Sequence, residues 1–214
     1  MGIENIKRLK LLSKEEFEKS IDFKLNKKNI LVTFHPVTLE DSTASEQFQN
    51  LLEAIDELEK TNIIFTKANS DTDGRIINSM IDEYINKNSQ KSIGFTSLGQ
   101  LRYLSALQFV DAMVGNSSSG LLEAPSFKIG TINVGDRQKG RIMADSVIDC
   151  DSNRLSITKA FEKLYKDEFQ ELLKNSNNPY GDGCASKSII EEIKKIELEG
   201  ILKKSFFDTG VIEY

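Results

Sequence analysis

Residues 115–123, GNSSSGLLE, combine three serines, a glycine and an acidic residue in a pattern that can bind a phosphate group. Ser117, Ser118, Ser119 and Gly120 have little side-chain bulk, so an anion can approach their backbone N–H groups, and the hydroxyls are further donors. A helix that begins here would add free N–H groups and the positive end of its dipole. An N-cap with ordinary polar turn residues would give the same pattern.

Acidic and basic residues follow these serines. Glu123 lies about one to two helical turns further on, where a carboxylate can accept hydrogen bonds from a pair of sugar hydroxyls. The basic turn GDRQKGR then follows at 135–141. Arg137 and Arg141 can each bind a phosphate through two N–H groups, although a solvated basic loop is the alternative interpretation.

Two further positions can bind a ligand. His35, the single histidine, stands directly before Pro36, which favours extended geometry. Its imidazole can donate to a diphosphate or a sugar oxygen, or transfer a proton, and a capped loop histidine is the alternative. Asn69 can contact a ligand hydroxyl or serve as a turn residue. The acidic residues after it, Asp71 and Asp73, lack the order of a calcium loop.

The elements that must position these residues alternate between strands and helices. Short apolar runs predict strands at 29–34, 62–66, 92–95, 111–115, 129–134 and 147–150. Helical spacing predicts helices near 13–21, 41–60, 75–87, 98–109, 154–166 and 184–203. This alternation indicates βαβ units in a Rossmann-like, three-layer α/β/α fold with a mainly parallel sheet. Ligands then bind in the loops at the carboxyl ends of the strands, which here carry all the candidate residues.

Two predicted helices raise questions of packing. In the helix at 98–109 we expect Leu101 and Leu104 to point inward. The last helix carries a stripe of four isoleucines, which predicts either core packing or a surface that docks another domain. The four are Ile189, Ile190, Ile193 and Ile196.

Composition excludes several classes of protein. The 214 residues are 39% hydrophobic, enough for a substantial core, and the net charge of −5 argues against nonspecific nucleic-acid binding. Cys150 and Cys184 lie far apart, which predicts free thiols in a reducing compartment and no zinc site. No apolar run reaches membrane-spanning length. We therefore expect a cytoplasmic protein without a metal or a cofactor.

Three motifs together resemble those of the hydrolysing UDP-N-acetylglucosamine 2-epimerases. They are HPVT at 35–38, KANSDTDGR at 67–75, and GNSSSGLLEAPSF with GDRQKGR at 115–141. The resemblance covers almost the whole chain and is greatest to the bacterial branch of sialic and related nonulosonic acid biosynthesis, which releases N-acetylmannosamine and UDP.

The resemblance implies a glycosyltransferase-B-like architecture, in which two Rossmann-like domains enclose the active site. This chain would supply only the C-terminal domain of such a protein. Residues 1–28 would lead in from a missing N-terminal domain, 29–183 would form the UDP-binding domain, and 184–214 would form a helix and tail that pack toward the missing domain.

The resemblance also implies residue roles. Ser117 and Ser118, with Ser119 and Gly120 beside them, would hold the diphosphate, and Glu123 would bind the ribose. His35 would act as the catalytic residue that faces the diphosphate and the sugar.

At the edges of this site, Arg137 would line the nucleotide pocket and the backbone near Leu98 would pair with uracil. Asn69 would complete the set of residues that bind the UDP-sugar.

The chemistry that the resemblance implies is elimination of UDP across C1–C2 of the sugar, followed by addition of water. The acid and base would lie on the missing domain, so we expect this chain alone to be inactive. We expect the full-length protein to be a homodimer that binds neither nucleic acid nor membrane. Two alternatives stay open: the donor domain of a UDP-sugar glycosyltransferase, and a stand-alone α/β binding module.

Overall fold

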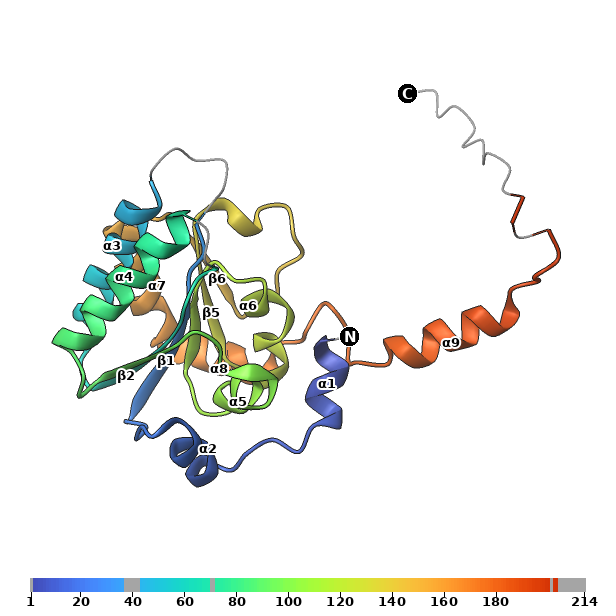
Figure 1. The fold of residues 1–214 in the computed structure, drawn as a ribbon, viewed down its shortest axis with the longest axis horizontal. Helices are drawn as coiled ribbons and strands as arrows, with labels where there is room; N and C mark the ends of the chain where they lie inside the picture. Colours follow the sequence, from blue (N-terminus) through green and yellow to red (C-terminus); the bar gives the residue numbers. More distant parts are fainter. Residues whose placement is uncertain (1, 37–42, 70–71, 201, 204–214) are drawn as a thin grey trace.

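A six-stranded parallel sheet forms the centre of the molecule (Figure 1). The computed structural model describes residues 2–36, 43–69, 72–200 and 202–203. The strands are β1 (Lys28–Thr33), β2 (Thr61–Thr66), β3 (Ser92–Phe95), β4 (Ala112–Gly115), β5 (Gly130–Val134) and β6 (Val147–Cys150). Their order in the sheet is β3-β2-β1-β4-β5-β6, and every pairing is parallel. The predicted α/β fold with a parallel sheet is confirmed.

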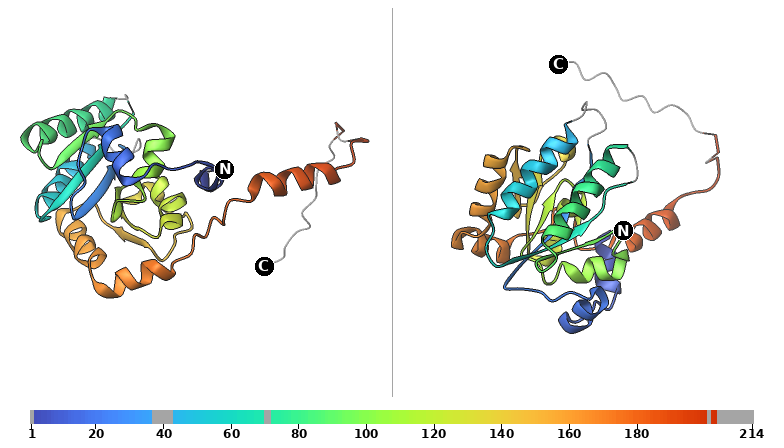
Figure 2. Two further views of the ribbon diagram at one scale, coloured as in Figure 1. Left: turned by 90° about the horizontal axis from the view of Figure 1, so that it is seen from below. Right: turned by 60° about the vertical axis from the view of Figure 1, so that its left-hand side comes forward.

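Helices cover both faces of this sheet (Figures 1 and 2). The described helices are α1 (Gly2–Arg8), α2 (Lys14–Ile21), α3 (Ala44–Asp56), α4 (Thr72–Lys87), α5 (Gly99–Ala106), α6 (Ser119–Leu122), α7 (Arg154–Leu164), α8 (Asp167–Asn175) and α9 (Ala185–Lys195), with 3-10 turns η1 (Ala124–Phe127) and η2 (Asp136–Gln138); α9 does not contact the sheet. One hydrophobic core lies under α3, α4, α7 and α8, and a second lies under α2 and α5. These two cores give the predicted three layers.

The central strand β1 shows why the sequence adopts this arrangement. Ile30 and Val32 point into the first core, whereas Leu31 points into the second, and all three are buried. A strand that is covered on both faces needs apolar residues at successive positions, as the NILVTF run provides.

The order of the strands reverses between β1 and β4. From β1 the chain adds β2 and then β3 on one side, and it later adds β4, β5 and β6 on the other. The connections therefore diverge at the carboxyl ends of β1 and β4. In open α/β sheets this reversal of strand order is where ligands bind.

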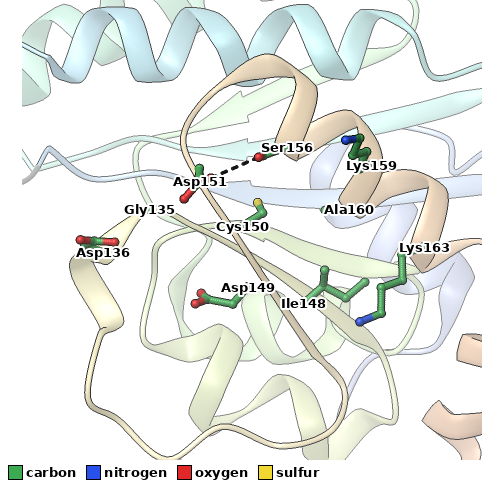
Figure 3. A pocket seen from close by; sticks show the side chains of 10 residues that line it. All are labelled: Gly135, Asp136, Ile148, Asp149, Cys150, Asp151, Ser156, Lys159, Ala160 and Lys163. Carbon is green, nitrogen blue, oxygen red and sulfur yellow. Dashed lines mark hydrogen bonds between the residues drawn. The ribbon is translucent and has the colours of Figure 1, made fainter.

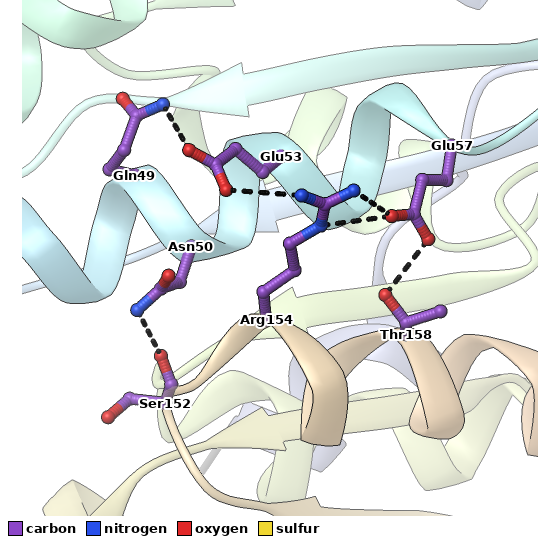
Figure 4. Close-up of polar contacts among 7 residues, drawn as sticks. All are labelled: Gln49, Asn50, Glu53, Glu57, Ser152, Arg154 and Thr158. Carbon is purple, nitrogen blue, oxygen red and sulfur yellow. Dashed lines mark hydrogen bonds and ion pairs between the residues drawn. The ribbon is translucent and has the colours of Figure 1, made fainter.

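An exposed polar cluster joins α3 to α7 across the first core (Figure 4). The Arg154 guanidinium contacts Glu57 at 2.5 Å and Glu53 at 3.7 Å. Thr158 donates to the second Glu57 oxygen at 3.0 Å, and Asn50 donates to the Ser152 carbonyl at 3.2 Å. These contacts fix the start of α7 beside α3, the helix that follows the His35 loop.

Several details differ from the sequence predictions. Helices α1 and α8 were not predicted; α8 is only 9 residues long and buries only Phe169 and Leu173. The last helix ends at Lys195 rather than 203. Leu101 is 38% exposed, so its predicted inward position is wrong. The short helix α5 buries Leu104, near its end, and leaves its first turn in solvent.

Helix α9 projects away from the sheet (Figures 1 and 2). Its four isoleucines are 49–60% exposed, so they do not pack in the core of the described structure. The segment before α9 passes close to α1: the Ser186 hydroxyl donates to Glu4, and Lys7 pairs with Asp182 at 3.6 Å. The described part of the chain has no helix of the length and apolarity that crossing a membrane requires.

The close approach of the end of β4 to β1 can be tested by substitution of Gly115. Gly115 has φ of +126°, and a Cβ there would lie 2.1 Å from the Thr33 carbonyl oxygen. We expect Gly115→Ala to lower the free energy of unfolding by about 4 kcal/mol or more, because neither backbone can move away. Gly140→Ala is the control: φ is +80° but no atom lies within 4 Å, so only about 1–2 kcal/mol is expected. Urea unfolding measures both, and equal losses would contradict the close approach.

Candidate functional site

The turn after β4 presents two free backbone donors. The N–H groups of Ser117 and Ser118 have no acceptor among the described residues, whereas the following N–H groups are engaged within the turn. For example, Gly120 N–H donates to the Ser117 carbonyl at 3.1 Å, and Leu121 N–H donates to Ser118 at 3.0 Å. The part-buried serines therefore have adjacent donors at the end of β4, which pairs with β1, as an anion site requires.

Helix α6, which follows these donors, is shorter than the sequence suggested. It has one turn, Ser119–Leu122, and Glu123 lies between it and η1. The dipole of one turn is small, so anion binding depends mainly on the individual N–H groups. Gly120 is also constrained by packing. A Cβ there would lie 2.6 Å from Thr131 Cγ2, so glycine is needed for packing against β5.

Asn116 brings the residues after β1 and β5 to this turn. Its side chain accepts from the His35 N–H at 2.8 Å and donates to the His35 carbonyl at 2.7 Å. Its carbonyl accepts from Arg137 at 3.0 Å and from Gln138 at 2.7 Å. The predicted residues His35 and Arg137 therefore lie on either side of the residue that precedes the serines. Sequence reasoning missed Asn116 and Gln138, although both lie within the motifs it singled out.

Glu123 directly follows helix α6, and one of its carboxylate oxygens is buried. Its Oε2 atom is buried and has no hydrogen-bond partner among the described residues. Burial raises the pKa of the Glu123 carboxyl above its ordinary value, and the nearby Ser119 hydroxyl offsets this only in part. Burial also raises the pKa of Tyr103, a neighbour of Ser119 and Glu123 that sequence reasoning missed. Ser119 faces this buried group rather than solvent, since its Oγ is inaccessible.

The remaining predicted residues follow β2 and β3 at the same edge of the sheet. Asn69 is exposed, and the Asn78 amide fixes the residue before it by hydrogen bonds of 2.8 and 3.1 Å to the Ala68 backbone. The Leu98 side chain is buried, and its carbonyl accepts from Arg102 at 2.8 Å. In the order of the sheet, the predicted residues thus follow five adjacent strands from β3 to β5.

Some predicted motif residues cannot be placed. Val37 and Thr38 of the HPVT motif, and Ser70 and Asp71 of the 67–75 loop, lie outside the described residues. Within the described ranges no three His, Cys, Asp or Glu side chains gather in a way that would hold a metal ion.

A separate polar cavity of about 370 Å³ lies between the end of β6 and α7 (Figure 3). It contains acidic, basic and thiol groups, and burial raises the pKa of its Cys150 thiol to about 12, which makes the thiol a poor nucleophile. Its lining residues are Gly135, Asp136, Ile148, Asp149, Cys150, Asp151, Ser156, Lys159, Ala160 and Lys163. None of these has a buried polar atom without a partner, in contrast to Glu123. The serine turn is therefore the stronger candidate.

Comparison with known proteins identifies the family. The family model described as UDP-N-acetylglucosamine 2-epimerase matches residues 1–194. The chain belongs to the UDP-N-acetylglucosamine 2-epimerase family. It is 43% identical to the GDP/UDP-N,N'-diacetylbacillosamine 2-epimerase (hydrolyzing) of Campylobacter jejuni over 95% of its own length and 53% of that protein. It is 35% identical to the Legionella pneumophila UDP-N,N'-diacetylbacillosamine 2-epimerase (hydrolyzing), over 95% and 52%. The chain thus spans about half the length of these relatives.

Solved structures agree with the fold. The Neisseria meningitidis UDP-GlcNAc 2-epimerase, a structure bound to UDP-GlcNAc, superimposes with a TM-score of 0.74 at 20% identity, over 91% of this chain and 53% of that one. Sucrose-phosphate synthase from Thermosynechococcus elongatus also matches, with a TM-score of 0.53 at 11% identity, over 88% and 50%. The fold therefore also occurs outside the epimerase family, whereas the sequence match assigns this chain to it.

The pH dependence of stability can test the raised pKa of the buried Glu123 carboxyl. Because its pKa is raised in the folded state, Glu123 contributes stability below the ordinary carboxyl pKa, and this is lost as pH rises through the raised pKa. We expect Glu123→Gln, which cannot ionise, to melt at a temperature equal to or above that of the unsubstituted chain at neutral pH, and the advantage to disappear in acid. Melting curves recorded from about pH 3 to about pH 8 cover both sides of the ordinary carboxyl pKa and the range above it. A deficit of the same size at every pH would contradict the raised pKa.

Proposed function

We propose that this chain is the nucleotide-binding half of a hydrolysing UDP-N-acetylglucosamine 2-epimerase. The observation that carries the proposal is the pair of free N–H groups at Ser117 and Ser118, located where the strand order reverses in a member of this family. A diphosphate has the charge and acceptors that such donors bind.

Most of the predicted residues have a role in this proposal. The Ser117 and Ser118 N–H groups bind the diphosphate, and Arg137 and His35 approach it from either side of Asn116. The unused Glu123 oxygen accepts from the ribose hydroxyls, which supply the donors that the buried carboxyl lacks.

Two outer positions complete the nucleotide site. The Leu98 N–H pairs with the base, because it has no acceptor among the described residues. Asn69 binds at the neighbouring strand end, where its exposed amide can reach the ligand.

The proposed reaction begins with elimination of UDP across C1–C2 of the sugar. The C1–O bond breaks, the electron pair leaves with the diphosphate, and a proton is lost from C2. Negative charge then develops on the leaving oxygens, where fixed N–H donors and a guanidinium stabilise it. Water adds to the intermediate to give N-acetylmannosamine. We propose that the acid and base for the proton transfers belong to the other half of the protein.

We also propose that α9 packs against that other half. The chain spans about half of its relatives, and the apolar face of α9 is exposed. Ser186 at the start of α9 is joined to Glu4 of α1, so the two segments that lead from the sheet domain lie together. An exposed apolar face of this kind is typical of an interface. A homodimer of the complete protein stays a prediction.

The names of two relatives suggest a second candidate substrate. Both are named for N,N'-diacetylbacillosamine, and one name includes GDP as well as UDP. The nucleotide site described above does not contact the acyl groups of the sugar in this proposal, so either sugar is compatible with it. A cytoplasmic location is also proposed, supported by the two unpaired cysteines, Cys150 and Cys184.

The proposed role of the Ser118 N–H group can be tested by substitution. Ser118 has φ of −61°, which proline can adopt, and its N–H has no acceptor in the described chain. We expect Ser118→Pro to leave the melting temperature almost unchanged and to weaken UDP binding by on the order of 2 kcal/mol, or roughly 30-fold, because one charge-assisted hydrogen bond is lost. Isothermal titration with UDP measures this.

Ser118→Ala is the matched control, since it keeps the N–H and removes only the hydroxyl. We expect it to bind UDP more tightly than Ser118→Pro. If the unsubstituted chain is folded and does not bind UDP at millimolar concentration, the proposed function is wrong. Tighter binding of GDP than of UDP would instead favour GDP as the nucleotide of the substrate.

A further inference from the structure

Asn116 is a buried residue at the centre of the candidate site. It is 1% exposed and directly follows Gly115, where β4 passes against the end of β1. The loops that follow β1 and β5 both meet it. These loops are connected through the backbone N–H and carbonyl of Asn116 and through its side-chain Oδ1 and Nδ2 atoms.

The side-chain amide fixes the backbone of His35. Oδ1 accepts from the His35 N–H at 2.8 Å, and Nδ2 donates to the His35 carbonyl at 2.7 Å. The amide thus pairs with both backbone groups of one residue, as a neighbouring strand would. This orients the chain at the point where β1 ends and before Pro36.

The backbone of Asn116 fixes the other side. Its carbonyl accepts from the Arg137 guanidinium at 3.0 Å and from the Gln138 amide at 2.7 Å. Gln138 is 2% exposed, so the second bond is shielded from water. The Asn116 N–H donates to the Thr33 carbonyl at 3.1 Å. All four polar groups of Asn116 are therefore engaged by protein.

We propose that Asn116, supported by Gln138, is a positioning residue that sets His35 and Arg137 at a fixed separation on either side of the diphosphate. The proposal rests on the proposed function, which assigns those two residues to the nucleotide. We assign Asn116 no direct contact with the ligand, because it is 1% exposed and each of its polar groups already has a partner within the chain. Among side chains that do not ionise, only an amide supplies an acceptor and a donor side by side in this way.

The chain contains a matched control in Asn29. This residue is 5% exposed and lies at the opposite end of β1. Its side chain holds the Asn26 backbone in the same way, with an N–H to Oδ1 bond of 2.9 Å and an Nδ2 to carbonyl bond of 3.0 Å. Asn29→Asp and Asn116→Asp both replace the amide donor of a buried two-point contact by an acceptor, but only the second contact is at the candidate site.

The experiment compares Asn116→Asp, Asn29→Asp and the unsubstituted chain, each without a histidine tag. Because His35 is the single histidine, its imidazole signals in an NMR spectrum need no assignment. UDP is titrated while these signals are recorded, and the dissociation constant and melting temperature are measured in parallel. The His35 response reports the orientation of the loop, which a loss of stability alone would not change.

We expect both variants to melt at a lower temperature than the unsubstituted chain. Only Asn116→Asp should lose the UDP-induced change at His35, and its dissociation constant should rise by roughly 10-fold, the usual effect of removing a partner that orients a binding group. Asn29→Asp should bind and respond like the unsubstituted chain. A normal His35 response and affinity in Asn116→Asp would overturn the proposal, as would equal losses in both variants.

Gln138→Met tests the same proposal if Asn116→Asp does not fold. It removes one donor to the Asn116 carbonyl and leaves the Arg137 bond in place. A weaker UDP affinity with a smaller His35 response supports the proposal, and unchanged binding overturns it. Failure of the proposed function is distinct from these outcomes, because the unsubstituted chain would then not bind UDP.

Discussion

The close approach of β4 to β1 is the contact on which the candidate site depends. Gly115 passes so near the Thr33 carbonyl that a side chain has no space, and the next residue, Asn116, is held at the end of β1. This contact brings the serine turn, the His35 loop and the basic turn after β5 together at the reversal of strand order. Without it, three loops that are distant in sequence would have no fixed relation to one another.

At the same edge of the sheet, several polar groups lack hydrogen-bond partners among the described residues. The domain buries an acceptor of Glu123 without a partner, and it leaves the N–H groups of Ser117 and Ser118 without acceptors in the described chain. Such groups are usually paired in proteins because unpaired polar groups are costly when buried. A ligand with anionic oxygens and neighbouring hydroxyls would satisfy all of them. The isoleucines of α9 and its C-cap are also exposed, and we propose that another part of the protein covers them.

The sequence predicted the sheet and most of its helices because apolar runs of β-branched residues, such as NILVTF, are strong local signals. It also predicted that His35, Ser117 and Arg137 share one edge, which follows from parallel topology. It did not predict Asn116 as the connecting residue, because its partner His35 is 81 positions away and only tertiary structure brings them together. The packing constraint on Gly120 was not predicted for the same reason, since its neighbour Thr131 belongs to another strand.

The most direct test of the account is the reaction of the complete gene product with UDP-N-acetylglucosamine in the absence of any sugar acceptor. If this chain is the nucleotide-binding half of a hydrolysing 2-epimerase, UDP and free N-acetylmannosamine are released in equal amounts. This chain alone then binds the nucleotide and does not turn the substrate over. The account would be contradicted if the complete product leaves both UDP-N-acetylglucosamine and nucleotide-linked diacetylbacillosamine intact, or if it consumes them only when an acceptor is added, as a glycosyltransferase would.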